Sequence, residues 1–177
     1  IDGTDIGQID PADLRRHIAL VPQDTFLLRG SLRDNLAAGR PEASDQEILQ
    51  AATLAGVHEM VGHHPRGYDL PIGERGLGLS GGQRQLVAIA RAVLSGAETI
   101  ILDEATSALD TQGEAAMTKR LAPYLDARTL IVITHRHSLL SLVDRLIVLD
   151  HGQIVADGAR DEIIEALSSG KITAAQP

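Results

Sequence analysis

Continuous apolar runs recur toward both ends of the chain. The runs at 18–21, 99–102 and 129–133 predict buried strands, because a strand covered on both faces does not alternate apolar and polar residues. Two further runs, 145–149 and 153–155, are separated by a short Asp-His-Gly segment and predict a hairpin. The intervals between the runs are long enough for helices, which indicates an α/β fold.

Helix signals fill several of these intervals. Asp10 followed by Pro11 predicts the cap and the first position of a short helix. Asp110 predicts the cap of another helix, which we expect to end before Pro123 because proline has no amide hydrogen to donate. A last helix is expected after Gly158.

The region between Phe26 and Leu94 has a different pattern, without strand-like runs. Its segment Ser44-Asp45-Gln46-Glu47 is a capping box, which predicts a helix that ends near Gly56. A glycine-rich loop at 73–82 precedes a second helix, whose apolar residues recur at helical spacing: Leu86, Ile89, Ala90, Val93 and Leu94. This pattern therefore predicts a helical subdomain inserted into the α/β fold.

These patterns divide the chain into three parts. We expect residues 1–25 and 95–168 to form one α/β core, residues 26–94 to form the inserted helical subdomain, and residues 169–177 to form a flexible tail.

Composition narrows the class of protein. The 177 residues carry 24 acidic and 16 basic side chains, a net charge of -8, which argues against a general nucleic-acid-binding surface. The sequence has no cysteine, so it contains neither a disulfide framework nor a thiolate metal site. No apolar run reaches the roughly 18 residues that a membrane-spanning helix needs. The chain begins with Ile1 rather than methionine, and we expect it to be a piece of a longer polypeptide.

The segment Leu79-Ser80-Gly81-Gly82-Gln83 is the most specific motif in the chain. Adjacent glycines at the start of a helix allow close approach to the backbone amides, the helix dipole places positive charge there, and Ser80 adds a hydroxyl donor. This combination suits an oxyanion such as phosphate. A loop that merely caps a helix is the plainer interpretation of Ser-Gly-Gly, but the full pentapeptide arises by chance on the order of once in 10⁴ chains of this length.

A second motif follows the apolar run at 99–102, where Asp103 and Glu104 stand at the end of the predicted strand. Ligands of open α/β sheets bind at the carboxyl ends of strands. Strand alternation would point the two carboxylates in different directions, so that one could hold Mg²⁺ while the other faces a water molecule. The alternative is a solvated turn with no role in chemistry.

Three further positions are weak signals when each is considered alone. Gln23 is a loop amide that follows the first run, and Ser107-Ala108-Leu109-Asp110 can be a plain helix cap. His135 follows the run at 129–133, where an imidazole could reach a phosphate or orient a water molecule.

Taken in order, these motifs resemble the ATPase domain of the ATP-binding cassette (ABC) family, over residues 1 to about 168. The resemblance implies a RecA-like P-loop NTPase core with an inserted α-helical signature subdomain. It also implies ATP and Mg²⁺ as cofactors, and a homodimer in which two chains sandwich ATP.

The resemblance implies a role for each position. Asp103 would hold Mg²⁺, usually through water, and Glu104 would be the catalytic base that polarises the hydrolytic water. Gln23 would sense Mg²⁺ and the attacking water, and His135 would be the switch residue on the γ-phosphate. The signature loop (Ser80, Gly81, Gly82 and Gln83) would embrace ATP held by the opposite subunit, and the D-loop (Ser107 to Asp110) would cross the dimer interface.

One motif of the family does not occur in the sequence. The 177 residues contain no Gly-x-x-x-x-Gly-Lys-Ser/Thr, so the first strand and the phosphate-binding P-loop of the RecA-like core are missing from it. In the family this loop lies upstream of the position that matches Ile1. We expect the chain by itself to be inactive, since it has the metal and water groups without the main phosphate grip.

Segments outside the motifs resemble the exporter branch of the family. Residues 69–76 are similar to the X-loop of exporters, with Ile72 where valine is usual, and residues 28–35 are similar to the segment that receives a coupling helix. Residues 1–9 and 134–150 are similar to type I secretion permease/ATPases, above all adhesin exporters. This implies a transmembrane domain on the same full-length chain, a periplasmic adaptor, an outer-membrane channel and a place at the cytoplasmic face of the bacterial inner membrane.

Two alternatives stay open. A soluble ABC ATPase that acts on ribosomes or DNA would show a tandem second cassette or long coiled-coil insertions, and this sequence shows neither. A truncated remnant without function is the other alternative, against which the intact Glu104, His135 and signature loop argue.

Overall fold

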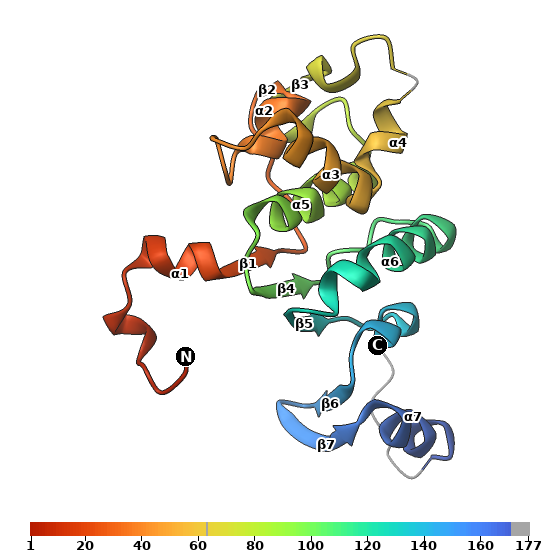
Figure 1. The fold of residues 1–177 in the computed structure, drawn as a ribbon. Coiled ribbons are helices and arrows are strands. Elements are labelled where there is room, and N and C mark those ends of the chain that lie inside the picture. Colours follow the sequence, from red (N-terminus) through yellow and green to blue (C-terminus); the bar gives the residue numbers. More distant parts are fainter. Residues whose placement is uncertain (63, 171–177) are drawn as a thin grey trace. The chain divides into compact units, whose positions relative to one another are not determined.

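The computed structural model describes residues 1–62 and 64–170, and Figure 1 shows its helices and strands. The chain divides into two compact units between His135 and Arg136. The first unit, Ile1–His135, holds all the candidate catalytic, nucleotide-binding and metal-binding residues named above. The second begins at Arg136. The expected tail at 169–177 lies for the most part outside the described residues.

The first unit is built on a parallel sheet of three strands. The strands are β1 (Ile18–Val21), β4 (Thr99–Asp103) and β5 (Thr129–Ile133), in the order β1-β4-β5. Val21 pairs with Leu102, and Asp103 pairs with Ile133. The α/β class is therefore confirmed, and β4, the strand that ends at Asp103, lies in the middle of the sheet.

Two of the predicted helix caps are formed as expected. The Asp10 side chain accepts from the amide of Ala12 and begins α1 (Pro11–His17), which follows a 3-10 turn at Ile6–Gln8. The Asp110 side chain accepts from the amide of Gly113 at 2.7 Å and begins α6 (Thr111–Leu125).

The predicted end of α6 before Pro123 is wrong. The helix continues through Pro123 to Leu125, and the amide of Asp126 still donates to the carbonyl of Ala122. Proline removes one donor of the ladder, but Leu121 and Leu125 are both buried, and their burial holds the last turn in place.

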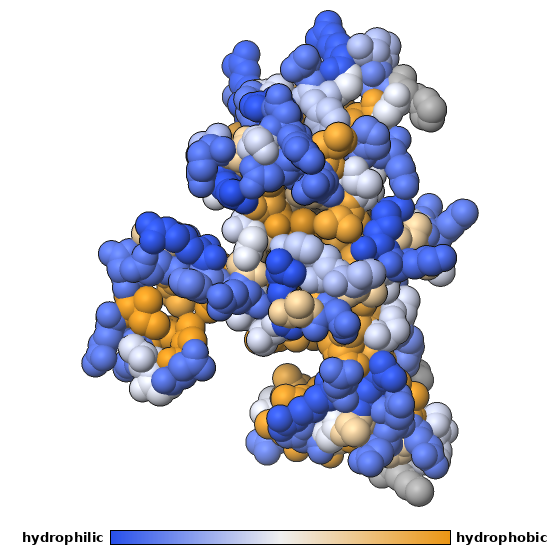
Figure 2. All heavy atoms as spheres, in the orientation of Figure 1, coloured by the Kyte–Doolittle hydropathy of each residue, from blue (hydrophilic) through white to orange (hydrophobic). Residues whose placement is uncertain are grey.

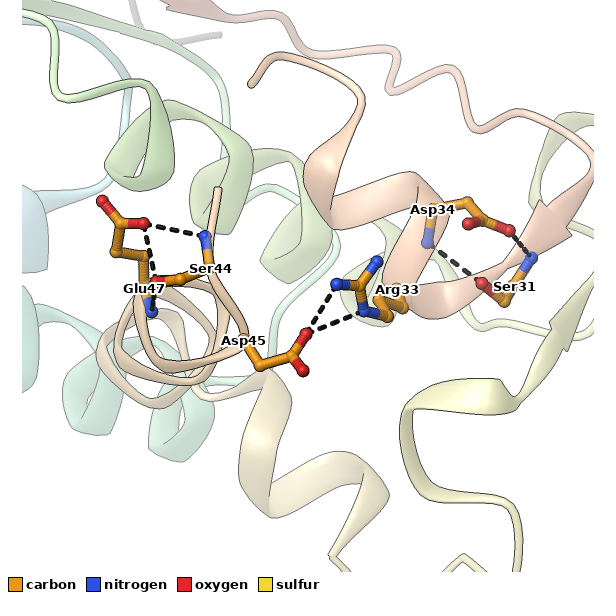
Figure 3. Close-up of polar contacts among 6 residues, drawn as sticks. All are labelled: Ser31, Arg33, Asp34, Ser44, Asp45 and Glu47. Carbon is orange, nitrogen blue, oxygen red and sulfur yellow. Dashed lines mark hydrogen bonds and ion pairs between the residues drawn. The ribbon is translucent and has the colours of Figure 1, made fainter. Parts of the chain in front are cut away.

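Helices dominate residues 26–94, as the sequence predicts. They are α2 (Leu32–Ala37), α3 (Asp45–Ala55), α4 (Val57–Val61) and α5 (Gly81–Ser95). Capping boxes begin α2 and α3, through Ser31 with Asp34 and Ser44 with Glu47, and Figure 3 shows both boxes beside the ion pair of Arg33 and Asp45. Helix α3 ends at Gly56 in a left-handed conformation, as expected.

The sequence pattern predicts no strands in this region, and this prediction is wrong. Strands β2 (Gly30–Ser31) and β3 (Pro71–Ile72) pair antiparallel, and 3-10 turns lie at Gly67–Asp69 and Glu74–Gly76. Two residues are too few to show a period of two, so these strands leave no signal in the hydropathy pattern.

The two faces of the three-stranded sheet differ in burial. Val21, Ile100 and Leu102 are buried, whereas Leu20, Ile131 and Ile133 are each about half exposed. The prediction that these strands are buried on both faces is therefore wrong, and β5 has no buried residue. Exposed apolar side chains show in Figure 2 as patches between hydrophilic ones. Across the described part of the chain, no helix combines the length and apolar character required to span a bilayer.

The second unit contains the predicted hairpin. A 3-10 segment at His137–Leu142 precedes β6 (Arg145–Asp150) and β7 (Gln153–Ala159), which pair antiparallel, and α7 (Arg160–Ser168) follows. Arg145 and Asp157 form an ion pair across the hairpin, with Nε to Oδ1 at 2.7 Å.

Candidate active site

The predicted site residues follow the carboxyl ends of the three parallel strands. Gln23 lies shortly after β1, Asp103 ends β4 with Glu104 next, and His135 lies shortly after β5. Because the strands run parallel, all three ends meet at one edge of the sheet. That edge is where open α/β sheets bind ligands.

Glu104 and His135 are in direct contact. The Nδ1 atom of His135 lies 2.9 Å from Oε1 of Glu104, so the imidazole donates to the carboxylate through Nδ1. The Glu104 side chain is 20% exposed and that of His135 is 62% exposed. The second carboxylate oxygen, Oε2, is buried and has no hydrogen-bond partner. A buried acceptor in this state needs a donor, such as a water molecule.

The backbone of Glu104 explains how this carboxylate is presented. Its amide donates to the carbonyl of Ile133 at 2.9 Å, which continues the pairing of β4 and β5 beyond the end of the strand. Its φ of 47° is left-handed, a conformation that costs a non-glycine residue about 1–2 kcal/mol. The expected strand alternation between Asp103 and Glu104 is therefore wrong, because Glu104 already belongs to the turn.

The signature segment forms the start of α5. Ser80 is the cap: its hydroxyl accepts from the amide of Gln83 at 3.2 Å, and its own amide donates to Oε1 of Gln83 at 2.8 Å. The amides of Gly81 and Gly82 lie in the first turn, where the helix ladder supplies no acceptor. No acidic residue stands in this turn, so the positive end of the helix dipole is not neutralised by its own side chains.

A polar cavity of about 230 Å³ joins these elements. It is lined by residues that follow β1, begin α5 or follow Glu104: Gln23, Asp24, Thr25, Gly81, Arg84, Gln85, Ser107 and Ala108. The structure thus brings Gln23, the signature loop and the segment after Glu104 to one cavity.

Comparisons with known proteins agree with this arrangement. A sequence model of the family described as ABC transporter matches residues 1–107. The cyclolysin secretion/processing ATP-binding protein CyaB of Bordetella pertussis is 45% identical over 166 residues, which are 94% of this chain and 23% of that protein. The chain belongs to the ABC transporter family.

Other relatives of the ABC transporter chain are equally similar. ATP-binding cassette sub-family B member 6 of Rattus norvegicus is 45% identical over 164 residues, 93% of this chain and 20% of that protein. A solved structure of a bacterial Atm1-family ABC exporter with ATP bound superposes with a TM-score of 0.87 at 38% identity, covering 93% of this chain and 29% of that one. The chain thus spans about a quarter of the length of these relatives.

Whether the site of this ABC transporter chain suits Mg²⁺ depends on the ligand atoms that its residues supply. Within residues 1–62 and 64–170, no group of three or more histidines and acids is placed to hold a metal ion. Asp103 at the end of β4 supplies one carboxylate, which fits Mg²⁺ because this ion is usually bound by one or two carboxylates together with water and phosphate oxygens. Asp110 is used differently, since its carboxylate caps α6.

Gln85 is a residue that the motif analysis missed. Only 4% of it is exposed, and its amide bonds to Ser107 and Ala108 in the segment after Glu104. It lies on the same face of α5 as Ile89, which is buried. A polar residue at an apolar position of the helix is the signal that could have found it.

Arg91, further along α5, was also missed. Its guanidinium donates to the carbonyls of Phe26 and Asn35 and to the side-chain oxygen of Asn35, and burial lowers its pKa from the ordinary value. Asn35 is fully buried and bonds in turn to the carbonyl of Leu28. This network ties the segment that follows Gln23 to the signature helix.

Proposed function

We propose that this chain is the ATP-binding and hydrolysis region of an exporter, with ATP and Mg²⁺ as cofactors. The observation that carries the proposal is the carboxylate of Glu104 at the carboxyl edge of the central strand. One oxygen of this carboxylate is bonded to His135 at 2.9 Å, and the other is buried without a partner. A carboxylate held in this way is suited to accept a hydrogen from an attacking water molecule.

The roles of the other residues are those that the family resemblance implies. His135 holds the Glu104 carboxylate through Nδ1, and Nε2 would donate to a γ-phosphate oxygen when the ring carries a hydrogen on both nitrogens. Asp103 holds the metal ion, and Gln23 responds to the metal and the water. Bound Mg²⁺ supplies charge neutralisation on the phosphate oxygens, which dominates phosphoryl transfer.

The signature loop acts on a nucleotide held by a second copy of the chain. The first turn of α5 presents the amides of Gly81 and Gly82 and the hydroxyl of Ser80, and Gln83 keeps the cap without adding a negative charge. The D-loop, which includes Asp110, lies at the interface of the two copies. Residues 1–25 and 95–168 act as the RecA-like core and residues 26–94 as its helical subdomain.

We further propose that the exporter works in type I protein secretion in bacteria, at the cytoplasmic face of the inner membrane. The support is the 45% identity to a protein named for cyclolysin secretion, together with the likeness of residues 1–9 and 134–150 to such secretion ATPases. A transmembrane domain on the same polypeptide, a periplasmic adaptor and an outer-membrane channel would complete the machine.

The test is Glu104→Gln in the complete gene product. Steady ATP turnover should fall by about 10²- to 10⁴-fold, the usual contribution of general base catalysis, while ATP binding is retained. Glu98→Gln is the matched control, because Glu98 is an exposed acid next to the opposite end of the same strand. Its turnover should equal that of the wild type.

A second measurement concerns residues 1–177 purified alone. Since the lysine loop that grips the phosphates does not occur in them, they should show no ATP turnover.

Wild-type turnover by Glu104→Gln would overturn the assigned base. A complete gene product that hydrolyses no ATP would overturn the proposed function and favour a remnant.

A further inference from the structure

The side chain of Gln85 joins α5 to the segment that follows Glu104. Its Oε1 accepts from the amide of Ala108 at 2.9 Å, and its Nε2 donates to the hydroxyl of Ser107 at 2.9 Å. Nε2 also lies 3.5 Å from the carbonyl oxygen of Glu104, a long contact. Because both the donor and the acceptor of this buried amide are engaged, the side chain is held in one orientation.

The same two segments are in close contact at the signature glycines. A Cβ atom added to Gly82 would lie 2.8 Å from the carbonyl oxygen of Ala108, and one added to Gly81 would lie 3.0 Å from the Cβ atom of Ala108. These glycines therefore permit α5 to touch the segment after Glu104 within the same chain. A surface this tight leaves the first turn of α5 and Ala108 no room to move independently.

Ala108 is connected to Glu104 through a short series of turns. The amide of Ser107 donates to the carbonyl of Glu104 at 3.1 Å, and the amide of Glu104 is fixed to the carbonyl of Ile133. The left-handed backbone of Glu104 lies between these two bonds. A shift of Ala108 would therefore act on the Glu104 backbone next to its attachment to β5.

We propose that Gln85 is a positioning residue that couples the two ATP sites of a paired molecule. It fixes the first turn of α5, which acts on the nucleotide held by the other copy, to the segment that positions Glu104 for the nucleotide of its own copy. Closure around one nucleotide thereby sets the catalytic carboxylate at the other. This inference rests on the proposed function, since it requires ATP hydrolysis by two copies.

The test uses Gln85→Met and Gln85→Glu in the complete gene product. Methionine fills the space without the amide, whereas glutamate keeps an acceptor for Ala108 and loses the donor to Ser107. In Gln85→Met, kcat should fall at least tenfold, because a displacement of about 1 Å at a reacting group can cost about 10²-fold. The Hill coefficient for ATP, which lies between 1 and 2 for two coupled sites, should fall to about 1. Gln85→Glu should give intermediate values of both.

Tyr124→Phe is the matched control. It removes a partly buried hydrogen bond to the other end of α5, from the Tyr124 hydroxyl to the carbonyl of Val93 at 2.8 Å. Its kcat and Hill coefficient should equal those of the wild type. Hydrogen exchange reports the contact directly, because the amide of Ala108 should lose protection in Gln85→Met and keep it in Tyr124→Phe.

The outcomes separate this inference from the proposed function. Wild-type kcat and Hill coefficient in Gln85→Met would overturn the coupling while leaving the proposed function intact. Equal losses in Gln85→Met and Tyr124→Phe would also overturn it, since they would reflect general destabilisation. If Gln85→Met does not fold, Gln85→Glu decides by the same readouts. A wild-type protein without ATP turnover would overturn the proposed function and this inference with it.

Discussion

Helices α3 and α5 begin with the same device and differ in what surrounds it. In both, a serine at the cap and a side chain three residues later satisfy each other's backbone amides, through Ser44 with Glu47 in α3 and Ser80 with Gln83 in α5. In α3 the third residue is acidic and Asp45 adds a second acid to the first turn (Figure 3). In α5 the third residue is neutral, the first two are glycines, and the turn has no acid.

The difference distinguishes what caps a helix N-terminus from what leaves that N-terminus able to bind an anion. A capping box with two acids completes the N-terminus of α3, because its charges already complement the helix dipole. The same box with a neutral glutamine forms the helix and leaves its positive end available for an anion. The cap thus explains why α5 begins at Gly81, and the absence of an acidic residue from its first turn supports the proposed contact with a nucleotide.

Exchanging the charge is the strongest way to break the comparison. Gln83→Glu in the complete gene product gives α5 the box of α3. Two like unit charges about 4–8 Å apart repel by roughly 2–4 kcal/mol at an effective dielectric constant near 20, so ATP turnover should fall by about 10²-fold while the thermal midpoint is unchanged or higher. ATPase assays and thermal melts measure the two quantities.

The reciprocal variant, Glu47→Gln, is the control for this exchange. It gives α3 the box of α5 and should leave turnover unchanged. Full ATPase activity in Gln83→Glu would show that the neutral residue is there only to cap the helix.

Removing the two cap hydroxyls gives a smaller effect and sharpens the comparison. Ser44→Ala and Ser80→Ala should each cost about 1 kcal/mol in the free energy of unfolding, measured by denaturant titration, because each loses a cap hydrogen bond. Only Ser80→Ala should also lower ATP turnover, by about tenfold, the lower end of what a hydrogen bond to a charged group contributes. Equal turnover in the two variants would contradict the proposed contact between Ser80 and the nucleotide.

The smallest expected effect is the pH dependence of the α3 box. The amide and the hydroxyl of Ser44 donate to Glu47 and lower the pKa of its carboxyl group, and the Arg40 guanidinium, 2.7 Å from Oε1, lowers it further. Because the folded pKa is depressed, this stabilisation is present above the unfolded value near 4.3 and is lost as the pH falls through the folded pKa. The stability gap between the wild type and Glu47→Gln should therefore be largest above about pH 5 and close in acid.

Chemical denaturation at a series of pH values measures that gap. The α5 box offers the internal reference, because Gln83 does not titrate. A gap that stays constant down to strong acid would show that the charge of Glu47 contributes nothing to the cap.

Local signals explain how much of the fold the sequence predicts. The runs at 18–21, 99–102 and 129–133 and the caps at Asp10, Ser44 and Asp110 depend on neighbouring residues, and the structure forms all of them. The prediction for the end of α6 is wrong because the burial of Leu125 outweighs the local effect of Pro123. Strands of two residues, β2 and β3, were too short to detect.

The candidate site divides in the same way. Glu104 and His135 could be predicted because parallel strands deliver them to a common edge. The left-handed turn at Glu104 could not, since strand alternation was the simpler expectation for a residue after β4. Gln85 and Arg91 stayed hidden because their partners lie 23 and 56 residues away in the chain, at Ala108 and Asn35.

The contacts of Arg91 have a bearing on how such a chain can vary. Two of its acceptors are main-chain oxygens, those of Phe26 and Asn35, which every amino acid carries. Replacing the side chain of Phe26 therefore leaves the acceptor in place. The exposed side chains near Phe26 can change in sequence without loss of this hydrogen bond. Related proteins could therefore carry different surface residues here, suited to different partner proteins, and keep the hydrogen bonds between this segment and α5.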